Sequence, residues 1–442
     1  MRLLRLAVLA VVVLSLGAYI YFVERHGPST DEFKQSQDKL FPGLDPAKIR
    51  RVVVTHPKGR FDLEKENGSW KIMAPIADEA NDGAVTALLS SLAGLKAERT
   101  LAAKDVKLGD YALDRPATSV VVTDDKGQES TLSLGAEMPL GNTRAARTRG
   151  DTVYVIARTI ATDVEKDLSG WRSNALVRVD AADVASLTIM DARGRVALAR
   201  AGREWTLTEP VADLAEREKA DDVVSDLSAA RIKEFVDAPG DLGTLGLEPP
   251  QLEITLVRKD GKPPVQLAFG SEREKDGTKQ RACKRAGRVT WVDATAAAKA
   301  STALADWRSK KLVRLDAWSA DIVEITAGKE KASVERKDGV FKAGNVEVDG
   351  DAVSNRLDIL ADMTVTAFDR PKPTGDAMGL VKVTAGGGAT VEATFYAGAG
   401  AGESIAVVPG RAGALAVDGA KVKELLSDPA SLSKPKAEPK TK

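Results

Sequence analysis

The chain has 442 residues, of which 43% are hydrophobic, and this length is typical of about three globular domains. Its 64 basic residues balance its 64 acidic residues, which argues against nucleic-acid binding because that usually requires a basic surface. The single cysteine, Cys283, excludes an intrachain disulfide and a cysteine-based metal cluster.

The N-terminal segment predicts a membrane anchor. Residues from Leu6 to Val23 form an uncharged stretch that is long enough to cross a bilayer as a helix. Two arginines precede this stretch, so we expect a cytoplasmic N-terminus and a periplasmic remainder, with a single pass through the inner membrane. A cleaved signal peptide, with its site near residues 15–17, is the alternative. We therefore predict an uncleaved anchor at residues 1–25, followed by a linker at residues 26–45.

A segment of ten residues, which we call a phrase, occurs twice in the chain. WRSNALVRVD at residues 171–180 recurs as WRSKKLVRLD at residues 307–316, which is 136 positions later. Three other phrases recur in the same order at offsets of 134 or 135 positions: GSWKIMAP and REWTLTEP, YALDRP and LGLEPP, LSLGAE and LAFGSE. Such a long period indicates copies of a whole domain rather than a solenoid.

A third copy is degraded. Phe341 takes the place of the tryptophan, AMGL ends at Leu380 where the L-x-x-P phrase is expected, and no closing WRS phrase is found. We predict three repeats, at residues 46–178, 179–314 and 315–429. The tail at residues 430–442 is rich in lysine and proline and is predicted to be disordered.

Each repeat is predicted to be α+β. Alternating runs such as IRRVVVTH, GRFDLEKE and SWKIMAP predict three strands, and a helix, a linker, four more strands and a closing helix follow. The first helix of each repeat has apolar residues at helical spacing: Val85, Leu88, Leu89, Leu92 and Leu95; Val223, Val224, Leu227 and Ala230; Val353, Leu357 and Leu360. This predicts seven strands in each repeat, in mostly antiparallel sheets with helices packed on one face.

The residues that could carry chemistry do not form a catalytic or metal-binding pattern. His26 and His56 are not spaced as metal ligands and are expected to be solvated, and Cys283 is expected to be a half-buried, unreactive thiol. The acidic clusters that begin at Asp78 and Asp213 precede helices, so we interpret them as helix caps rather than calcium ligands. The glycine-rich segment 397–404 lacks the lysine of a P-loop. No catalytic residue, metal ligand or cofactor is predicted.

Residues that recur at equivalent positions are interpreted as structural anchors. Trp70, Trp205 and Phe341 are expected to pack in the cores of successive repeats. Trp171 and Trp307 are expected to lie between neighbouring repeats, since each begins a phrase that closes one repeat and opens the next. Their neighbours, Arg172 and Arg308, are expected to bond helix-terminal carbonyls.

The phrases together resemble a known family. The spacings W-x-x-x-x-P from Trp205, L-x-x-P from Leu247, LxxG-E from Leu267 and the pair Trp307-Arg308 look like the bacterial domain-of-unknown-function family 4340. The resemblance covers most of residues 40–428. Members are often found with ABC-transporter components of the kind linked to gliding motility, which implies an accessory role in the cell envelope.

The expected function is therefore non-enzymatic. We expect an envelope protein whose periplasmic repeats bind or organise protein partners, such as the permease of an ABC-type transporter. Two alternatives remain: a module that binds peptidoglycan or another polysaccharide, and an envelope hydrolase that uses paired carboxylates.

Overall fold

The computed structural model describes residues 39–101, 106–139, 141–400 and 402–435. The predicted span from Leu6 to Val23 lies outside these residues, as does His26. Within the described ranges, no helix has the length and apolar character needed to cross a membrane. The chain forms two compact units, one ending at Asn174 and the other beginning at Ala175.

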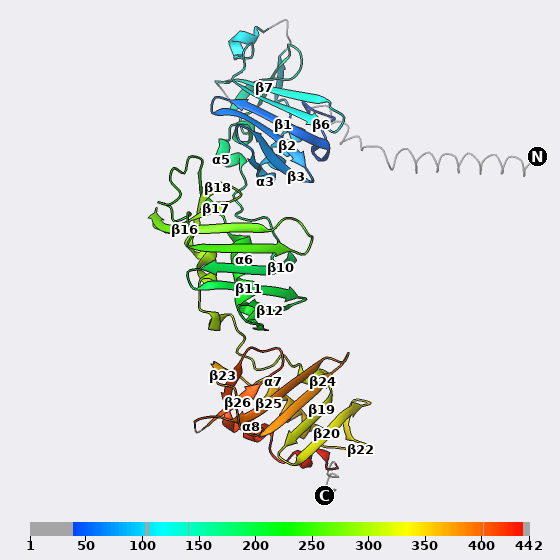
Figure 1. Ribbon diagram of the computed structural model, residues 1–442. Coiled ribbons are helices and arrows are strands. Elements are labelled where there is room, and N and C mark those ends of the chain that lie inside the picture. The colour runs from blue at the N-terminus through cyan, green and yellow to red at the C-terminus, as the bar shows by residue number, and fades with distance from the viewer. Residues whose placement is uncertain (1–38, 102–105, 140, 401, 436–442) are drawn as a thin grey trace, which may run out of the picture. The chain divides into compact units, whose positions relative to one another are not determined.

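The first unit contains one nine-stranded sheet (Figure 1). The strand order is β4-β3-β2-β1-β6-β7-β8-β9-β5, and the central strands β1 and β6 are antiparallel. The strands are β1 (Ile49–His56), β2 (Gly59–Glu66), β3 (Ser69–Ala74), β4 (Asp78–Glu79), β5 (Arg99–Leu101), β6 (Thr118–Asp124), β7 (Glu129–Glu137), β8 (Thr143–Arg147) and β9 (Val153–Ala157).

The second unit contains two further sheets with the same strand order. One has β10 (Val184–Asp191), β11 (Gly194–Ala201), β12 (Glu204–Glu209), β13 (Asp213–Leu214), β14 (Ile232–Val236), β15 (Leu252–Arg258), β16 (Val265–Lys275), β17 (Thr278–Arg285) and β18 (Arg288–Asp293). The other has β19 (Ala320–Ala327), β20 (Glu330–Lys337), β21 (Val340–Ala343), β22 (Val346–Glu347), β23 (Val365–Arg370), β24 (Gly379–Ala385), β25 (Thr390–Ala397), β26 (Glu403–Val407) and β27 (Ala414–Asp418). We call the three sheets, with their helices, the first, second and third repeats.

The α+β class and the antiparallel sheets are confirmed, but the number of strands was underestimated. Each sheet has nine strands rather than seven, because the two outermost strands were missed. One of these, β4 and its counterparts, has only two residues, which is too short to show an alternating pattern. The third repeat keeps the full strand order although its sequence is degraded.

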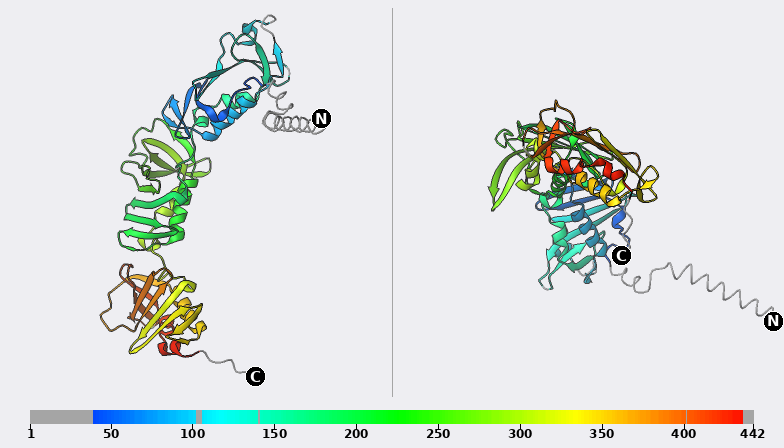
Figure 2. Two further views of the ribbon diagram at one scale, coloured as in Figure 1. Left: turned by 90° about the vertical axis from the view of Figure 1, so that its right-hand side faces the viewer. Right: turned by 90° about the horizontal axis from the view of Figure 1, so that it is seen from below.

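A helix packs on one face of each sheet and supplies the predicted apolar stripe. These helices are α3 (Asp82–Gly94), α6 (Arg217–Ala229) and α7 (Gly350–Ala361). Every residue of the three predicted stripes is buried or nearly so, and the stripes join the strands in one core per repeat. In the third repeat a second helix, α8 (Gly419–Leu425), lies beside α7 (Figure 2, right, in red and yellow).

The predicted closing helices are broken into short pieces. In the first repeat they are α4 (Ile160–Val164) and α5 (Leu168–Trp171), and in the second they are two 3-10 helices, Ala294–Ala300 and Leu304–Asp306. The prediction that the tail is disordered from residue 430 is wrong for the first residues of the tail. Residues Pro429–Ser433 form a 3-10 helix, because Leu432 is buried in the core of the third repeat.

The opposite face of the sheet is covered in part by the L-x-x-P phrase. Leu113 packs on Ala145 and Val153 in the first repeat, and Leu247 packs on Ala282 and Trp291 in the second. The glycine of the LxxG-E phrase makes this packing possible. A Cβ atom on Gly135 would lie 2.2 Å from the Tyr111 carbonyl oxygen, and one on Gly270 would lie 2.0 Å from the Leu245 oxygen. The two recurring phrases are therefore partners in one contact.

Gly270→Ala is expected to lower the free energy of unfolding of the second unit by about 3 kcal/mol, because the added methyl group cannot fit without moving backbone. Urea denaturation of the full chain measures the change. The control is Gly375→Ala in the same unit, where nothing lies within 4 Å of the new atom and the effect should stay within about 0.5 kcal/mol. Equal effects of the two changes would contradict the close contact.

Leu380 is not the third copy of Leu247. It lies inside β24, which begins at Gly379, whereas Leu247 precedes β15, which begins at Leu252. The strand register also places Tyr396, which follows Phe395, where Gly270 follows Phe269. The third repeat therefore cannot hold an L-x-x-P segment in the same close contact.

Candidate functional site

The first half of the repeated phrase closes a repeat by pairing with the edge of its own sheet. In the first unit Arg172 bridges to Ala80, and the Ser173 N–H donates to the Glu79 carbonyl at 2.9 Å. In the second, Arg308 bridges to Ala215, and the Ser309 N–H donates to the Leu214 carbonyl at 2.8 Å. Both arginines are buried. The phrase thus covers an edge that would otherwise expose unpaired backbone groups.

Each of these arginines meets a buried aspartate at the end of the edge strand. The Arg172 Nε atom lies 3.1 Å from Asp78 Oδ2, and the Arg308 Nε atom lies 2.5 Å from Asp213 Oδ2. Asp78 and Asp213, the first residues of the two acidic clusters, are therefore not helix caps. Asn81, which the sequence offered with Asp82 as a candidate cap, does cap α3, since its side chain accepts from the Ala84 N–H.

The second half of the phrase opens the next repeat by pairing beside its other edge. The Leu312 N–H donates to the Met363 carbonyl at 2.8 Å, next to β23. The Leu176 N–H donates to the Ala230 carbonyl at 3.1 Å, next to β14. Each opening segment therefore belongs to the repeat that follows it.

The first repeat has an opening half as well, which the sequence comparison missed. The Leu40 N–H donates to the Leu95 carbonyl at 2.9 Å, and Asp45 caps a 3-10 helix as Asp180 does. Leu40 stands 136 positions before Leu176. The prediction of a linker reaching residue 45 is therefore wrong from residue 39 onward, because these residues pair with the first repeat.

Arg411 of the third repeat reaches the same aspartate as Arg308. Its Nε atom lies 2.5 Å from Asp213 Oδ1, and its other nitrogens donate to the carbonyls of Ser309, Lys311 and Leu312. Asp213 is fully buried and the two arginine side chains are each 1% exposed. Burial lowers the pKa of Arg411, and its hydrogen bond to Asp213 opposes this effect. One carboxylate thus joins the second and third repeats.

Further contacts strengthen this junction. Arg308 also binds Asp369 at 2.8 Å and donates to the Ala412 carbonyl at 2.7 Å. Arg314, from the opening half of the phrase, donates to the Trp205 carbonyl and lies 2.9 Å from Glu204. The prediction that Arg308 meets helix-terminal carbonyls is corrected: its main acceptors are carboxylates from both repeats. Neither Asp213 nor Arg411 was predicted as a site residue.

The tryptophans of the phrase are core residues. Trp171 and Trp307 are both 0% exposed, and each packs within the hydrophobic core of the repeat that it closes. The prediction that they act as wedges between repeats is therefore wrong, because each side chain is buried in the core of its own repeat. At the junction of the second and third repeats the contacts come from Arg308, whereas Trp307 packs in the core of the second repeat.

The other predicted anchors also lie in the cores. Trp70, Trp205 and Phe341 are buried, each in its own repeat. Each aromatic ring is covered by a cation from the neighbouring strand: Lys65 at 5.9 Å, Arg200 at 5.3 Å and Arg336 at 4.6 Å from the ring centre. The Trp205 Nε1 atom donates to Asp221 at 2.8 Å.

The outer end of the third repeat replaces the ion pair by apolar residues. Val346 holds the position of Asp78 and Asp213 in the strand register, and Pro435 pairs with Val348 where Arg308 pairs with Ala215. Both members of the pair change together.

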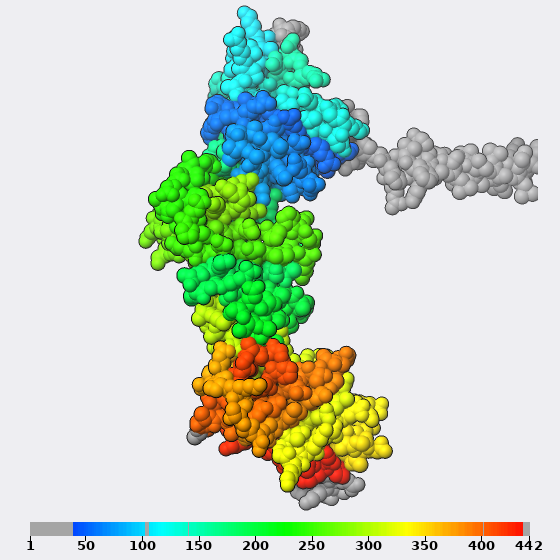
Figure 3. Space-filling view, in the orientation of Figure 1, coloured from blue at the N-terminus to red at the C-terminus, as the bar shows by residue number. Residues whose placement is uncertain are grey.

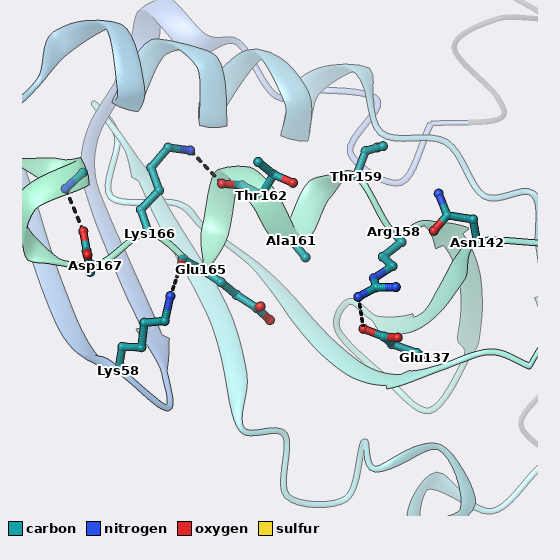
Figure 4. A pocket seen from close by; sticks show the side chains of 11 residues that line it. Lys58, Glu137, Asn142, Arg158, Thr159, Ala161, Thr162, Glu165, Lys166 and Asp167 are labelled. Carbon is teal, nitrogen blue, oxygen red and sulfur yellow. Dashed lines mark hydrogen bonds and ion pairs between the residues drawn. The ribbon is translucent and has the colours of Figure 1, made fainter.

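The first repeat has an open cleft of about 730 Å³ beside α4 and α5 (Figure 4). Its lining side chains are mostly polar and include three cations and three carboxylates: Lys58, Glu137, Asn142, Arg158, Thr159, Ala161, Thr162, Glu165, Lys166, Asp167 and Gly170. Arg158 pairs with Glu137 at 2.9 Å, and Glu165 pairs with Arg144 at 2.7 Å. A hydrogen bond from Ser169 lowers the pKa of Asp167, which caps α5. Lys166 pairs with Asp163 at 3.1 Å, so most of these charges have a partner in the cleft or beside it.

His56 lies behind this cleft and is buried, so the prediction that it is solvated is wrong. The Lys58 backbone N–H donates to His56 Nδ1, which leaves Nε2 to donate to the Lys166 carbonyl at 2.8 Å. Nε2 therefore holds the segment between α4 and α5, and Nδ1 holds the β1–β2 turn. Among the described residues, no group of three or more His, Cys, Asp or Glu side chains could hold a metal ion.

Cys283 is fully buried in β17 rather than half-buried. Desolvation raises the pKa of its thiol from 9.0 to about 12. In the unfolded chain the Cys283 thiol ionises above pH 9, whereas in the folded chain it stays protonated. The contribution of this thiol to folding stability is therefore complete below pH 9 and is lost as the pH rises toward 12. Each pH unit in that window costs about 1.4 kcal/mol.

We therefore expect Cys283 to resist a maleimide reagent at pH 8 in the native chain and to react once urea unfolds the second repeat. The unfolding free energy of the wild type should also fall more steeply between pH 9 and 11 than that of Cys283→Ala. Rapid labelling of the native thiol, or parallel pH profiles of the two proteins, would show that the thiol is not desolvated.

The family model described as "Domain of unknown function (DUF4340)" matches residues 70–241 and 205–382. The two matches begin at Trp70 and Trp205, which are 135 positions apart, so they follow the period of the sheets. The chain belongs to this family. Each DUF4340 match includes one junction phrase, with Trp171-Arg172 in the first and Trp307-Arg308 in the second. None of the curated proteins matches the chain.

Proposed function

We propose that this DUF4340 protein is a non-enzymatic component of the cell envelope that binds and organises protein partners. In this proposal residues 6–23 anchor it in the inner membrane, and the repeats lie in the periplasm. The partner that we propose is the permease of an ABC-type transporter, to which the chain would be an accessory component.

The observation that carries the proposal is the buried contact of Asp213 with Arg308 and Arg411. A buried carboxylate is costly unless it is well paired, and here two guanidinium groups from successive repeats pair with it. This contact holds two copies of one sheet against each other, and its members are closed to solvent. Two copies of one sheet that are held together in this way offer several surfaces to partner proteins. This arrangement fits a protein that organises partners better than it fits an enzyme with one active site.

The cleft of the first repeat also favours binding over catalysis. Its Arg158–Glu137 and Arg144–Glu165 pairs hold the charges that a general acid or base would use, and His56 has both nitrogens bonded to backbone. A polar surface of mixed charge fits a protein segment with charges of both signs.

The test is cross-linking and affinity purification of the full-length chain from membranes solubilised in detergent. The expected result is recovery of inner-membrane ABC-transporter subunits. The control is the same chain with residues 1–25 replaced by an unrelated span, which should recover the same subunits if the repeats bind them. Recovery of no transporter subunit would contradict the proposal. Retention on isolated peptidoglycan, or hydrolysis of glycan or ester substrates, would instead support one of the alternative functions.

A further inference from the structure

The β8–β9 turn of the first repeat is the counterpart of the turn that carries Arg411. β8 and β9 hold the same places in the strand order as β26 and β27. The β26–β27 turn projects Arg411 onto Asp213 of the preceding repeat. The β8–β9 turn contains Arg149, and Arg147 ends β8 immediately before it.

The two turns differ in what their arginines bind. Arg411 is buried by Asp213 and three backbone carbonyls. Arg149 is exposed and Arg147 is half-buried, and neither forms an ion pair or a side-chain hydrogen bond with any residue that the structure describes. The described part of the chain has no sheet before the first repeat to offer an aspartate. The turn lies on the surface of the first unit, in the turquoise part of the space-filling view around residue 150 (Figure 3).

We propose that the β8–β9 turn docks on a carboxylate of the partner protein, as the β26–β27 turn docks on Asp213. This inference rests on the proposed function and adds the place and the chemistry of the contact. Arginine suits the role because its planar group can donate two parallel hydrogen bonds to a carboxylate. Asp151 in the same turn is also exposed. Its negative charge repels a uniformly acidic surface, so the turn prefers a partner with a single carboxylate at this position.

The position of the first repeat favours a membrane protein as the partner. The repeat begins at Lys39, and fifteen residues separate Lys39 from the end of the predicted span at Val23. Fifteen residues can span at most about 50 Å, so the turn can meet a periplasmic loop of a protein in the same membrane.

The test is photo-cross-linking of the full-length chain in membranes, with a benzoylphenylalanine at residue 148, which is Thr148 in this chain. We expect a cross-link to the ABC permease beside an aspartate or glutamate. Arg149→Glu should lower its yield at least tenfold, and added salt should lower the wild-type yield. The control Arg60→Glu changes an exposed arginine on β2 of the same sheet and should leave the yield within twofold. Replacing the acidic residue of the partner by arginine should restore the cross-linking yield of the Arg149→Glu variant.

The outcomes separate this inference from the proposed function. If the wild type captures the permease and Arg149→Glu captures it equally well, the docking turn is wrong and the proposed function stands. If the wild type captures no transporter subunit in the purification, the proposed function fails and the docking turn fails with it. If the photoprobe labels lipid, and Arg149→Glu instead weakens binding to phosphatidylglycerol vesicles, the turn binds headgroups and the inference is overturned. Unchanged urea denaturation of Arg149→Glu excludes misfolding as the cause.

Discussion

Asp213→Ala is expected to lower the free energy of unfolding of the unit that begins at Ala175 by about 3–5 kcal/mol. The substitution leaves the buried guanidinium groups of Arg308 and Arg411 without their shared carboxylate, and an uncompensated buried charge is strongly destabilising. Urea denaturation of the full chain measures the loss. Labelling of Cys283 by a maleimide provides a readout confined to the second repeat, because this thiol is buried there.

The matched control is Glu209→Ala in the same repeat. Glu209 pairs with Arg195, and both side chains are about half exposed, so the loss should stay below about 1 kcal/mol. If Asp213→Ala costs no more than Glu209→Ala, the buried network does not stabilise the unit.

Trp307→Ala is expected to cost about 3–5 kcal/mol, because it removes a fully buried aromatic side chain from the core of the second repeat. Thiol labelling of Cys283 in urea again reports the second repeat directly. The control is Trp318→Ala, because Trp318 is 74% exposed and its loss should change the unfolding free energy by about 0.5 kcal/mol or less.

This substitution also distinguishes the two roles considered for Trp307. A core residue predicts that the second repeat itself becomes less stable. A wedge between repeats predicts that Cys283 keeps its protection while protease cleavage increases between residues 308 and 316. The second pattern would contradict the packing described above.

The sequence predicted those parts of the fold that have a repeating pattern. The stripe from Val85 to Leu95 identified α3, and alternation in IRRVVVTH identified β1, because helices and half-buried strands place apolar residues at fixed intervals. The two-residue strand Asp78–Glu79 has no such interval and is formed by pairing with β3. The closing helices were predicted as continuous, but in the first repeat α4 ends at Val164 and α5 begins at Leu168.

The junction was predicted from the repeated phrase, but its chemistry was not. Asp213 and Arg308 are 95 positions apart, and an aspartate before a helix is usually a cap, so local patterns favoured the wrong role. A signal was nevertheless present. Asp78 and Asp213 recur with the same period as Arg172 and Arg308, and the third repeat loses both members of the pair, with Val346 and Pro435 in their places.

Arg411 could not have been predicted from the period. The β17–β18 turn has only two residues between its strands, whereas the β26–β27 turn has six. Arg411 therefore has no counterpart at a fixed offset, and its role depends on how the turn projects from the third sheet.

The contact of Asp213 with Arg308 and Arg411 couples the second and third repeats. Hydrogen exchange of the full-length chain, read in β12 of the second repeat and β27 of the third, tests it most directly in the Arg411→Met variant. Methionine keeps much of the volume but removes the bond to Asp213. We expect protection to fall in both repeats, because Arg411 binds Asp213 and the Ser309 carbonyl at the closing edge of the second repeat. Loss of protection in the third repeat alone would contradict the coupling.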